Sequence, residues 1–281
     1  WHNSGASAYA AFTELEYRTL MPAEFLTEGI DQTRGWAYTL LILNVILTGR
    51  AEAPFKAFLF QGHVLDAQGN KMSKSLGNIV EGIEALSNNS VDILRFYLVW
   101  KASPIDSLNF SFTEMKTRPY QVLNTLYHMH LYFVQNSFYD RFDEDRHNVK
   151  WAEEKGLLKP QEKWLLSKLH SLNVQVVEGY GRCRFHEVAR ALESCIIDDL
   201  SQTYVPMTRS EIWDDRPETL DRRLAIYATL AHVLKYLDVI LHPISPYTTE
   251  YLYHTCFKNA RETILLEGWP HVDKTYVDPA I

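Results

Sequence analysis

The pattern of apolar and polar positions changes near residue 110. Before that point, short apolar runs alternate with polar turns. A buried helix is predicted over 33–47, closed by Gly49, and a β-prone apolar run, AFLFQGHVL, predicts a strand over 57–65. Strands, loops and helices in alternation are typical of an α/β layer. We therefore predict an α/β domain over residues 1–110.

After residue 110, apolar residues recur at helical spacing, as they do over 122–133, 165–176 and 185–196. The stretch 220–241 is apolar on more than one face, which indicates a helix at the centre of a bundle. We predict an all-α helical bundle over residues 111–281.

The starts of two bundle helices are expected from local signals. SFTE (111–114) has the pattern of a capping box, in which Ser111 caps the helix and Glu114 reaches back to the cap. SPYTT, from residue 245, places a capping Ser245 before a proline at the first helical position.

Composition narrows the class of protein. The net charge is -7; residues 1–112 carry 8 basic and 11 acidic side chains, and the remainder carries 20 and 24. Neither part has the basic excess of a general nucleic-acid binder, so any RNA contact must come from local patches such as Arg182, Arg184 and Arg190. Three cysteines without CxxC spacing fit a reducing, cytoplasmic compartment.

Other classes of site find little support in the sequence. Ala37 to Leu47, the most apolar run, is far shorter than the ~20 residues of a membrane-spanning helix. Eleven histidines include no H-E-x-x-H pattern, and we predict no protein-bound metal. The chain starts at Trp1 and not at Met, in what reads as the middle of a motif, so we expect it to be part of a larger protein.

The stretch NKMSKSLGN (70–78) is the first candidate for chemistry. Taken alone, two lysines three residues apart are most often a solvated surface loop. The same residues also suit a mobile polyphosphate clamp, because ammonium groups are compact charges for phosphate oxygens. Hydroxyls of Ser73 and Ser75 add donors, and Gly69 and Gly77 allow the loop to swing.

A second candidate is PAEFLTEGIDQTRGW (22–36), at the start of the predicted buried helix. Glu28 and Asp31 offer carboxylates to the ammonium group of an amino acid, Gln32 can bond a ribose or a carboxylate, and Trp36 adds a flat apolar wall. Acids at a helix N-terminus that pair with the macrodipole, beside an ordinary core tryptophan, explain the same pattern.

GHVLDAQGNKMSKSLGN resembles the second signature motif of the class I aminoacyl-tRNA synthetases, and PAEFLTEGIDQTRGW resembles the isoleucyl branch of that family. WHNSG at the start is similar to the W-F-x-S-G block of the same branch. The resemblance implies that the α/β domain is the C-terminal part of a Rossmann-type catalytic domain, and that the enzyme joins isoleucine to ATP and then to tRNA(Ile). Mg²⁺ would enter with the nucleotide.

The resemblance also implies roles for individual residues. Catalysis would involve Lys71, Ser73 and Lys74. The residues implied to bind ATP are Gly62, His63, Lys71, Met72, Ser73, Lys74 and Ser75. Those implied to bind the aminoacyl-adenylate are Trp1, Glu28, Gly29, Asp31, Gln32 and Trp36. His2 and Ala37 stand where the family usually has phenylalanine, which leaves the shape of the pocket open.

The bundle resembles the anticodon-binding domain of these enzymes, through KWLLSKLHSLNVQVVEGY, DDLSQTY and HPISPYTTEYLY. After Leu200 the sequence departs from the family, because two basic residues are missing and Pro206 introduces a helix breaker. Residues left to contact tRNA are Tyr204, Arg209 and Trp213, with Arg182 and Arg184 nearby in sequence.

The H-I-G-H signature, which holds the other half of the ATP site in this family, is not in the sequence. We therefore expect the chain by itself to be inactive. A valyl or leucyl type of synthetase and a non-catalytic RNA-binding module remain as alternatives. The residues Glu28 to Gln32 argue against the first, and the intact Lys71 and Lys74 argue against the second.

Overall fold

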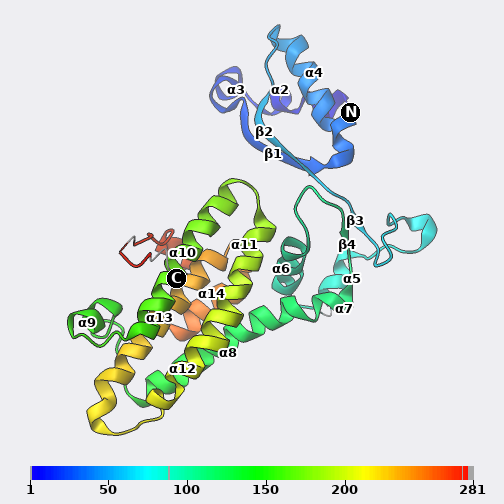
Figure 1. The fold of residues 1–281 in the computed structure, drawn as a ribbon. Coiled ribbons are helices and arrows are strands. Elements are labelled where there is room, and N and C mark those ends of the chain that lie inside the picture. Colours follow the sequence, from blue (N-terminus) through cyan, green and yellow to red (C-terminus); the bar gives the residue numbers. More distant parts are fainter. Residues whose placement is uncertain (1, 88, 274, 278–281) are drawn as a thin grey trace. The chain divides into compact units, whose positions relative to one another are not determined.

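The computed structural model describes residues 2–87, 89–273 and 275–277. The chain forms two compact units. One comprises residues 1–80 with 102–110, and the other comprises 81–101 with 111–281. Their elements follow one another from blue to red in Figure 1.

The first unit contains a parallel strand pair joined by a helix. Strand β1 (Ala23–Gly29) pairs with β2 (Phe55–Gln61), and α4 (Trp36–Thr48) connects them. The predicted helix over 33–47 is confirmed. It ends as predicted at Gly49, whose φ of 67° lies in the left-handed region that glycine adopts without strain. The unit's other elements are α1 (His2–Gly5), α2 (Ser7–Ala11), α3 (Glu14–Leu20) and the 3-10 turns η1 (Ile30–Arg34) and η2 (Lys74–Leu76).

The predicted strand over 57–65 is divided in two. Pairing with β1 ends at Gln61, and the chain continues as β3 (Val64–Leu65), which pairs in parallel with β4 (Leu108–Asn109). Gly62 lies at the break, where its N–H donates to the Pro104 carbonyl at 2.9 Å. A Cβ on Gly62 would stand 2.0 Å from the Asp106 carbonyl oxygen, so this close approach of two backbones requires glycine.

The second unit is the expected helical bundle. Its helices are α5 (Gly82–Ser87), α6 (Val91–Lys101), α7 (Phe112–Met115), α8 (Arg118–Tyr139), α9 (Val149–Glu154), α10 (Pro160–Gly181), α11 (Phe185–Ser194), α12 (Val205–Ile212), α13 (Leu220–Leu241) and α14 (Pro246–Cys256), with the π-helix η3 (Cys195–Tyr204) and the 3-10 turns η4 (Pro217–Thr219) and η5 (Ile264–Glu267).

Helix α13 forms the centre of the bundle, as its apolar faces predicted. Leu230, Val233, Leu234 and Leu237 are all buried in one hydrophobic core with residues of α8, α10 and η3. Among the described residues, one stretch, 217–241, is long and apolar enough to cross a membrane by length and composition, and 78% of its most apolar window is buried in the bundle. A helix at the centre of a protein core meets the same criterion.

The structure differs from the predicted domain limits over residues 81–101. The prediction placed them in the first domain, whereas α6 belongs to the bundle. Phe96 and Tyr97 of α6 are fully buried. Arg95 donates to the carbonyl of Ile244 at 2.9 Å, and Arg190 of α11 donates to the carbonyls of Trp100 and Lys101 at 3.2 Å. These long-range contacts are invisible to local sequence patterns.

Two helix N-termini are capped differently from the prediction. Ser111 accepts from the N–H of Glu114 at 3.3 Å, as predicted, but the Ser111 N–H donates to the Tyr97 hydroxyl and not to Glu114. Ser245 makes no side-chain cap on α14. Instead the Asp92 carboxylate, from α6, accepts from the N–H of Thr248 in the first turn of α14. In both places a side chain from another helix replaces the local partner.

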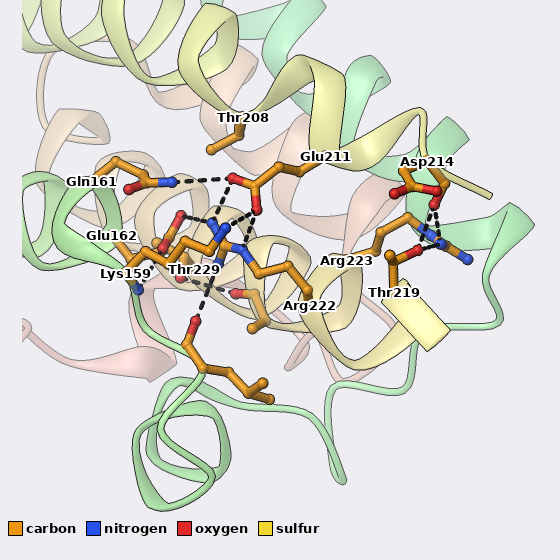
Figure 2. Close-up of polar contacts among 12 residues, drawn as sticks. Lys159, Gln161, Glu162, Thr208, Glu211, Asp214, Thr219, Arg222, Arg223 and Thr229 are labelled. Atoms are coloured by element: carbon orange, nitrogen blue, oxygen red, sulfur yellow. Dashed lines mark hydrogen bonds and ion pairs between the residues drawn. The ribbon is translucent and has the colours of Figure 1, made fainter. Parts of the chain in front are cut away.

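Pro206 does not break the helix. It lies in the first turn of α12, directly after the π-helix η3, and the backbone on its N-terminal side stays in the right-handed helical region at Tyr204 and Val205. Helix α12 is held by the polar cluster of Figure 2, in which Arg222 donates to Glu211 of this helix at 2.8 Å and to Glu162 at 2.9 Å. The hydroxyl of Tyr204 donates to the same Glu162 at 3.1 Å.

Candidate functional site

The residues expected to bind an aminoacyl-adenylate lie at the carboxyl end of β1 and directly after it. Glu28 and Gly29 end the strand, Asp31 and Gln32 belong to η1, and Trp36 begins α4. Trp1 lies outside the described residues. Ligands of α/β proteins bind beyond the carboxyl ends of parallel strands, and the exposed Glu28 carboxylate is placed there.

Gln32 organises this turn with both ends of its amide. Its nitrogen donates to Asp31 Oδ2 at 2.9 Å, and its oxygen accepts from the backbone N–H of Trp36 at 3.1 Å. The amide therefore satisfies one of the free N–H groups at the start of α4. Gly29 packs against the same turn, because a Cβ there would stand 2.7 Å from Asp31 Oδ1.

The ring of Trp36 is held from two sides. Its indole N–H donates to the carbonyl of Ser4 at 2.9 Å, and its ring meets Phe58 of β2 edge-on, with centroids 6.2 Å apart. Gly5 follows at the contact of α1 with α4. A Cβ on Gly5 would lie 2.8 Å from Leu43 Cδ1 and 2.9 Å from the backbone of Thr39. Glycine thus allows α1 to approach α4 closely.

Gly62 and His63, expected near the nucleotide, occupy the bend between β2 and β3. The carbonyl of His63 accepts from the N–H of Leu108 at 2.9 Å, which joins the bend to β4. The bend is therefore fixed by backbone contacts on both sides.

The lysine loop, residues 66–78, begins directly after β3. Asp66 N–H donates to the carbonyl of Asn70 at 2.9 Å, and Leu65 forms an antiparallel bridge with Lys71. Gly69 and Gly77 both have positive φ, 85° and 64°. They provide the two turns that bring residue 78 back to residue 66.

The two lysines of the loop are exposed. Neither Lys71 nor Lys74 forms an ion pair with any side chain that the structure describes. Met72 and Ser73 between them are partly buried, and the hydroxyls of Ser73 and Ser75 lie 3.1 Å apart. The loop therefore presents two free ammonium groups and a pair of hydroxyls, which is a suitable donor set for phosphate oxygens.

The residues expected to contact tRNA differ in their surroundings. Arg182 pairs with Glu178 at 3.2 Å, and Arg184 pairs with both Glu178 at 2.9 Å and Glu187 at 3.0 Å. Acidic neighbours within the same segment thus offset both charges.

Tyr204 is fully buried, so the expectation that it contacts tRNA is wrong. Its side chain lies in the bundle core, where the Glu162 carboxylate accepts a hydrogen bond from its hydroxyl. Arg209 lies over the ring of Trp213 at 5.8 Å, and Trp213 is 68% exposed. This pair presents a cation and an aromatic face to solvent.

Buried titratable groups in the bundle form pairs that hold the core. His130 and Asp238 are both fully buried, and Nε2 and Oδ2 are 2.9 Å apart. Burial raises the pKa of Asp238; burial alone would lower the pKa of His130, but the carboxylate outweighs it and raises that pKa. The described residues contain no group of three or more potential metal ligands.

The model of class I tRNA synthetases (I, L, M and V) matches residues 1–111, and the model of the anticodon-binding domain of tRNA ligase matches residues 162–281. The chain belongs to the class I tRNA synthetases. The first match contains the residues expected to bind the adenylate and the lysine loop, and the second contains most of the bundle.

Among relatives of this synthetase chain, isoleucine–tRNA ligases show 30–35% identity. That of Methanothermobacter thermautotrophicus is 35% identical over 96% of this chain and 26% of its own length. That of Methanopyrus kandleri is 35% identical over 92% and 24%, and that of Methanothrix thermoacetophila is 31% identical over 100% and 27%. The chain thus spans about a quarter of the length of these curated relatives.

Solved synthetase structures share the fold. The LeuRS–tRNA–LeuAMS ternary complex of Agrobacterium radiobacter K84 aligns with a TM-score of 0.69 at 18% identity, over 92% of this chain and 29% of that chain. Mycobacterium tuberculosis methionyl-tRNA synthetase in complex with methionyl-adenylate aligns with a TM-score of 0.70 at 18% identity, over 85% and 45%.

The sequence did not predict the residues that hold the candidate site in place. Ser4 belongs to the WHNSG stretch, but it contributes only its backbone carbonyl, so its residue type does not reveal the contact with Trp36. Asp66 and Asn78 flank the lysine loop as ordinary turn residues. Their separation by twelve positions gives no local signal that the two side chains meet.

Proposed function

We propose that the enzyme to which this chain belongs activates isoleucine with ATP and transfers it to tRNA(Ile). The chain supplies the KMSKS side of the ATP site and the anticodon-binding domain. The observation that carries the proposal is the pair of free ammonium groups, Lys71 and Lys74, on a folded loop in the same compact unit as the Glu28–Trp36 segment. Identity to isoleucine–tRNA ligases along nearly the whole chain supports the choice of amino acid.

The proposed first step is an in-line displacement at the α-phosphate of ATP. A carboxylate oxygen of isoleucine forms the new bond to phosphorus, and the bond from phosphorus to the bridging oxygen breaks. Pyrophosphate leaves with that electron pair, as its complex with Mg²⁺. Lys71 and Lys74 stabilise the charge that grows on the leaving phosphates, with Ser73 and Ser75 as further donors.

The other residues of the first unit bind and orient. Glu28 receives the ammonium group of isoleucine, and Trp36 forms one wall of the side-chain pocket. Asp31 and Gln32 shape the turn between them. Gly62 and His63 lie beside the adenine, where the glycine leaves the backbone accessible.

The bundle binds tRNA through a local patch. Arg209 and Trp213 are the stronger candidates, because an exposed aromatic face with a cation above it can stack with a base. Arg182 and Arg184 contribute less, since Glu178 and Glu187 compete with phosphate for them.

The amino-acid substrate is tested by pyrophosphate exchange into ATP, measured on the intact enzyme with isoleucine, valine and leucine in turn. We expect the highest kcat/KM for isoleucine, with valine lower because it lacks one methylene in an apolar pocket. A preference for valine or leucine would assign the enzyme to another branch of the family. Exchange with none of the three would favour the non-catalytic RNA-binding module.

A further inference from the structure

Asn78 and Asp66 join the two ends of the lysine loop. Asn78 Nδ2 donates to Asp66 Oδ2 at 2.9 Å and to the carbonyl of Lys71 at 3.2 Å, and Asn78 Oδ1 accepts from the N–H of Ser73 at 2.9 Å. One amide side chain thus binds the backbone on both sides of Met72. The segment between the two lysines is held from the far end of the loop.

Asp66 anchors the amide of Asn78 to the turn at the start of the loop. Its Oδ1 accepts from the N–H groups of Gln68 at 3.0 Å and Asn70 at 2.7 Å, while Oδ2 faces Asn78. Both carboxylate oxygens are therefore used. The hydrogen bonds from Asn78 and from the backbone of Asn70 hold the pKa of Asp66 below its ordinary value.

We propose that Asn78, anchored by Asp66, is a positioning residue that fixes the backbone of Lys71–Ser73 before ATP binds. The proposal rests on the proposed function, since it concerns the step in which the two lysines meet the phosphates. Asn78 itself touches no reacting atom. It acts through the backbone that carries the lysines.

Pre-organisation is the physical reason for an effect on rate. The two glycines with positive φ make the loop easy to deform, and its lysines form no ion pair with the described side chains to hold it in place. Without Asn78, the backbone of Lys71–Ser73 loses two hydrogen bonds and samples many conformations. Binding of the phosphates must then order the Lys71–Ser73 backbone, and the loss of conformational entropy opposes this step.

The test is pre-steady-state adenylate formation by the intact enzyme with Asn78→Ala. We expect the rate to fall roughly 10- to 100-fold, the range for losing two or three hydrogen bonds of ordinary net strength. The KM for isoleucine should change less than about twofold, because the Glu28–Trp36 segment does not contact Asn78. A disturbance of the whole fold would change both parameters.

Asn78→Asp separates the contacts from one another. The carboxylate still accepts from the Ser73 N–H, but it cannot donate to Lys71 or Asp66, and it places like charge against Asp66. We expect a loss at least as large as in Asn78→Ala. The double variant Asp66→Ala with Asn78→Ala should be no slower than the slower single variant, because the two residues act as one unit.

Gln68→Ala is the matched control. Gln68 is an exposed amide on the same loop, and only its backbone makes a hydrogen bond among the described residues. Its rate should stay within about twofold of the parent. A normal rate in Asn78→Ala, or a rate faster than the parent, would overturn the proposal; the faster rate would mean that Asn78 holds the loop away from the phosphates.

Trypsin cleavage after Lys71 and Lys74 provides a readout independent of catalysis. Cleavage follows the population of the open loop, so Asn78→Ala should be cut several-fold faster than the parent and Gln68→Ala should not. An enzyme that activates no isoleucine but shows this pattern would refute the proposed function and keep the positioning role. An active enzyme with equal cleavage in all three proteins would refute the positioning role alone.

Discussion

The indole N–H of Trp36 donates to the carbonyl of Ser4 at 2.9 Å, across 32 positions of the sequence. The next residue, Gly5, allows this contact, because any Cβ there would meet Leu43 and Thr39 of α4. The tryptophan wall of the proposed isoleucine pocket is thus set by a helix that precedes the strand pair. The position of the Trp36 ring therefore depends on residue 5 being a glycine.

Gly5→Ala should disturb this wall in the intact enzyme. The added methyl group forces α1 away from α4, at a cost of about 1–3 kcal/mol in the free energy of unfolding. We expect the KM for isoleucine to rise several-fold while the KM for ATP changes little. Gly82→Ala is the control, since a Cβ there meets nothing within 4 Å. Equal effects of the two substitutions on isoleucine would argue against the assigned pocket.

Lys74→Ala should slow adenylate formation in the intact enzyme by roughly 10²–10³, the scale for removing one preorganised donor. The charge acts on phosphates in the transition state, so the apparent affinity for isoleucine should barely change. Lys74→Arg should restore only part of the rate, because a planar fork does not replace a point charge. Rapid-quench kinetics separates the two parameters. Weaker isoleucine binding at a normal rate would assign Lys74 to the other substrate.

Arg209→Ala and Trp213→Ala should each weaken tRNA binding by the intact enzyme. Loss of one stacking contact is worth about 1–3 kcal/mol, so we expect a fall of roughly tenfold for Trp213→Ala in a filter-binding assay. Arg182→Ala is the contrasting variant, because Glu178 already offsets its charge. If Arg182→Ala weakens binding more than Trp213→Ala, the patch lies at the C-terminal end of α10 and not at that of α12.

The pH dependence of stability should report Glu211. Burial acts to raise the pKa of this carboxyl, but hydrogen bonds from Arg222 and Lys159 outweigh burial and lower it to about 2. A folded-state pKa below the unfolded value of 4.5 means that the stabilisation is complete above pH 4.5 and is lost as the pH falls towards 2. In urea unfolding, the difference between the parent chain and Glu211→Gln should shrink over that range. A difference in the free energy of unfolding that stays constant with pH would show that the ionised Glu211 carboxylate is not the source of the stabilisation.

Breaking the buried pair His130–Asp238 should reduce the free energy of unfolding more than replacing both residues together. Asp238→Ala leaves His130 without its partner in the core, and we expect a loss of about 3–5 kcal/mol in the free energy of unfolding. Replacing both residues by leucine removes both polar groups together and should cost clearly less. Chemical denaturation of the three proteins measures this. Similar losses in both variants would show that packing, and not the pair, matters there.

The sequence alone determined the local features of this protein. Period and composition located α4 with its end at Gly49, the bundle helices and the central place of α13, because each depends on residues within a few turns of one another. The resemblance of the lysine loop and of the Glu28–Trp36 segment to one enzyme family led to the proposed chemistry, since each of these segments is contiguous in the chain.

Tertiary structure decided whatever depends on distant partners. It assigned α6 to the bundle, buried Tyr204 against Glu162, and replaced the expected Ser245 cap by Asp92. Burial and hydrogen bonds between residues far apart in the sequence decide which of several possible side chains makes a contact. The local sequence favours each of these side chains equally. For the same reason, only the fold shows that Asn78 and Asp66 meet where the two ends of the lysine loop come together.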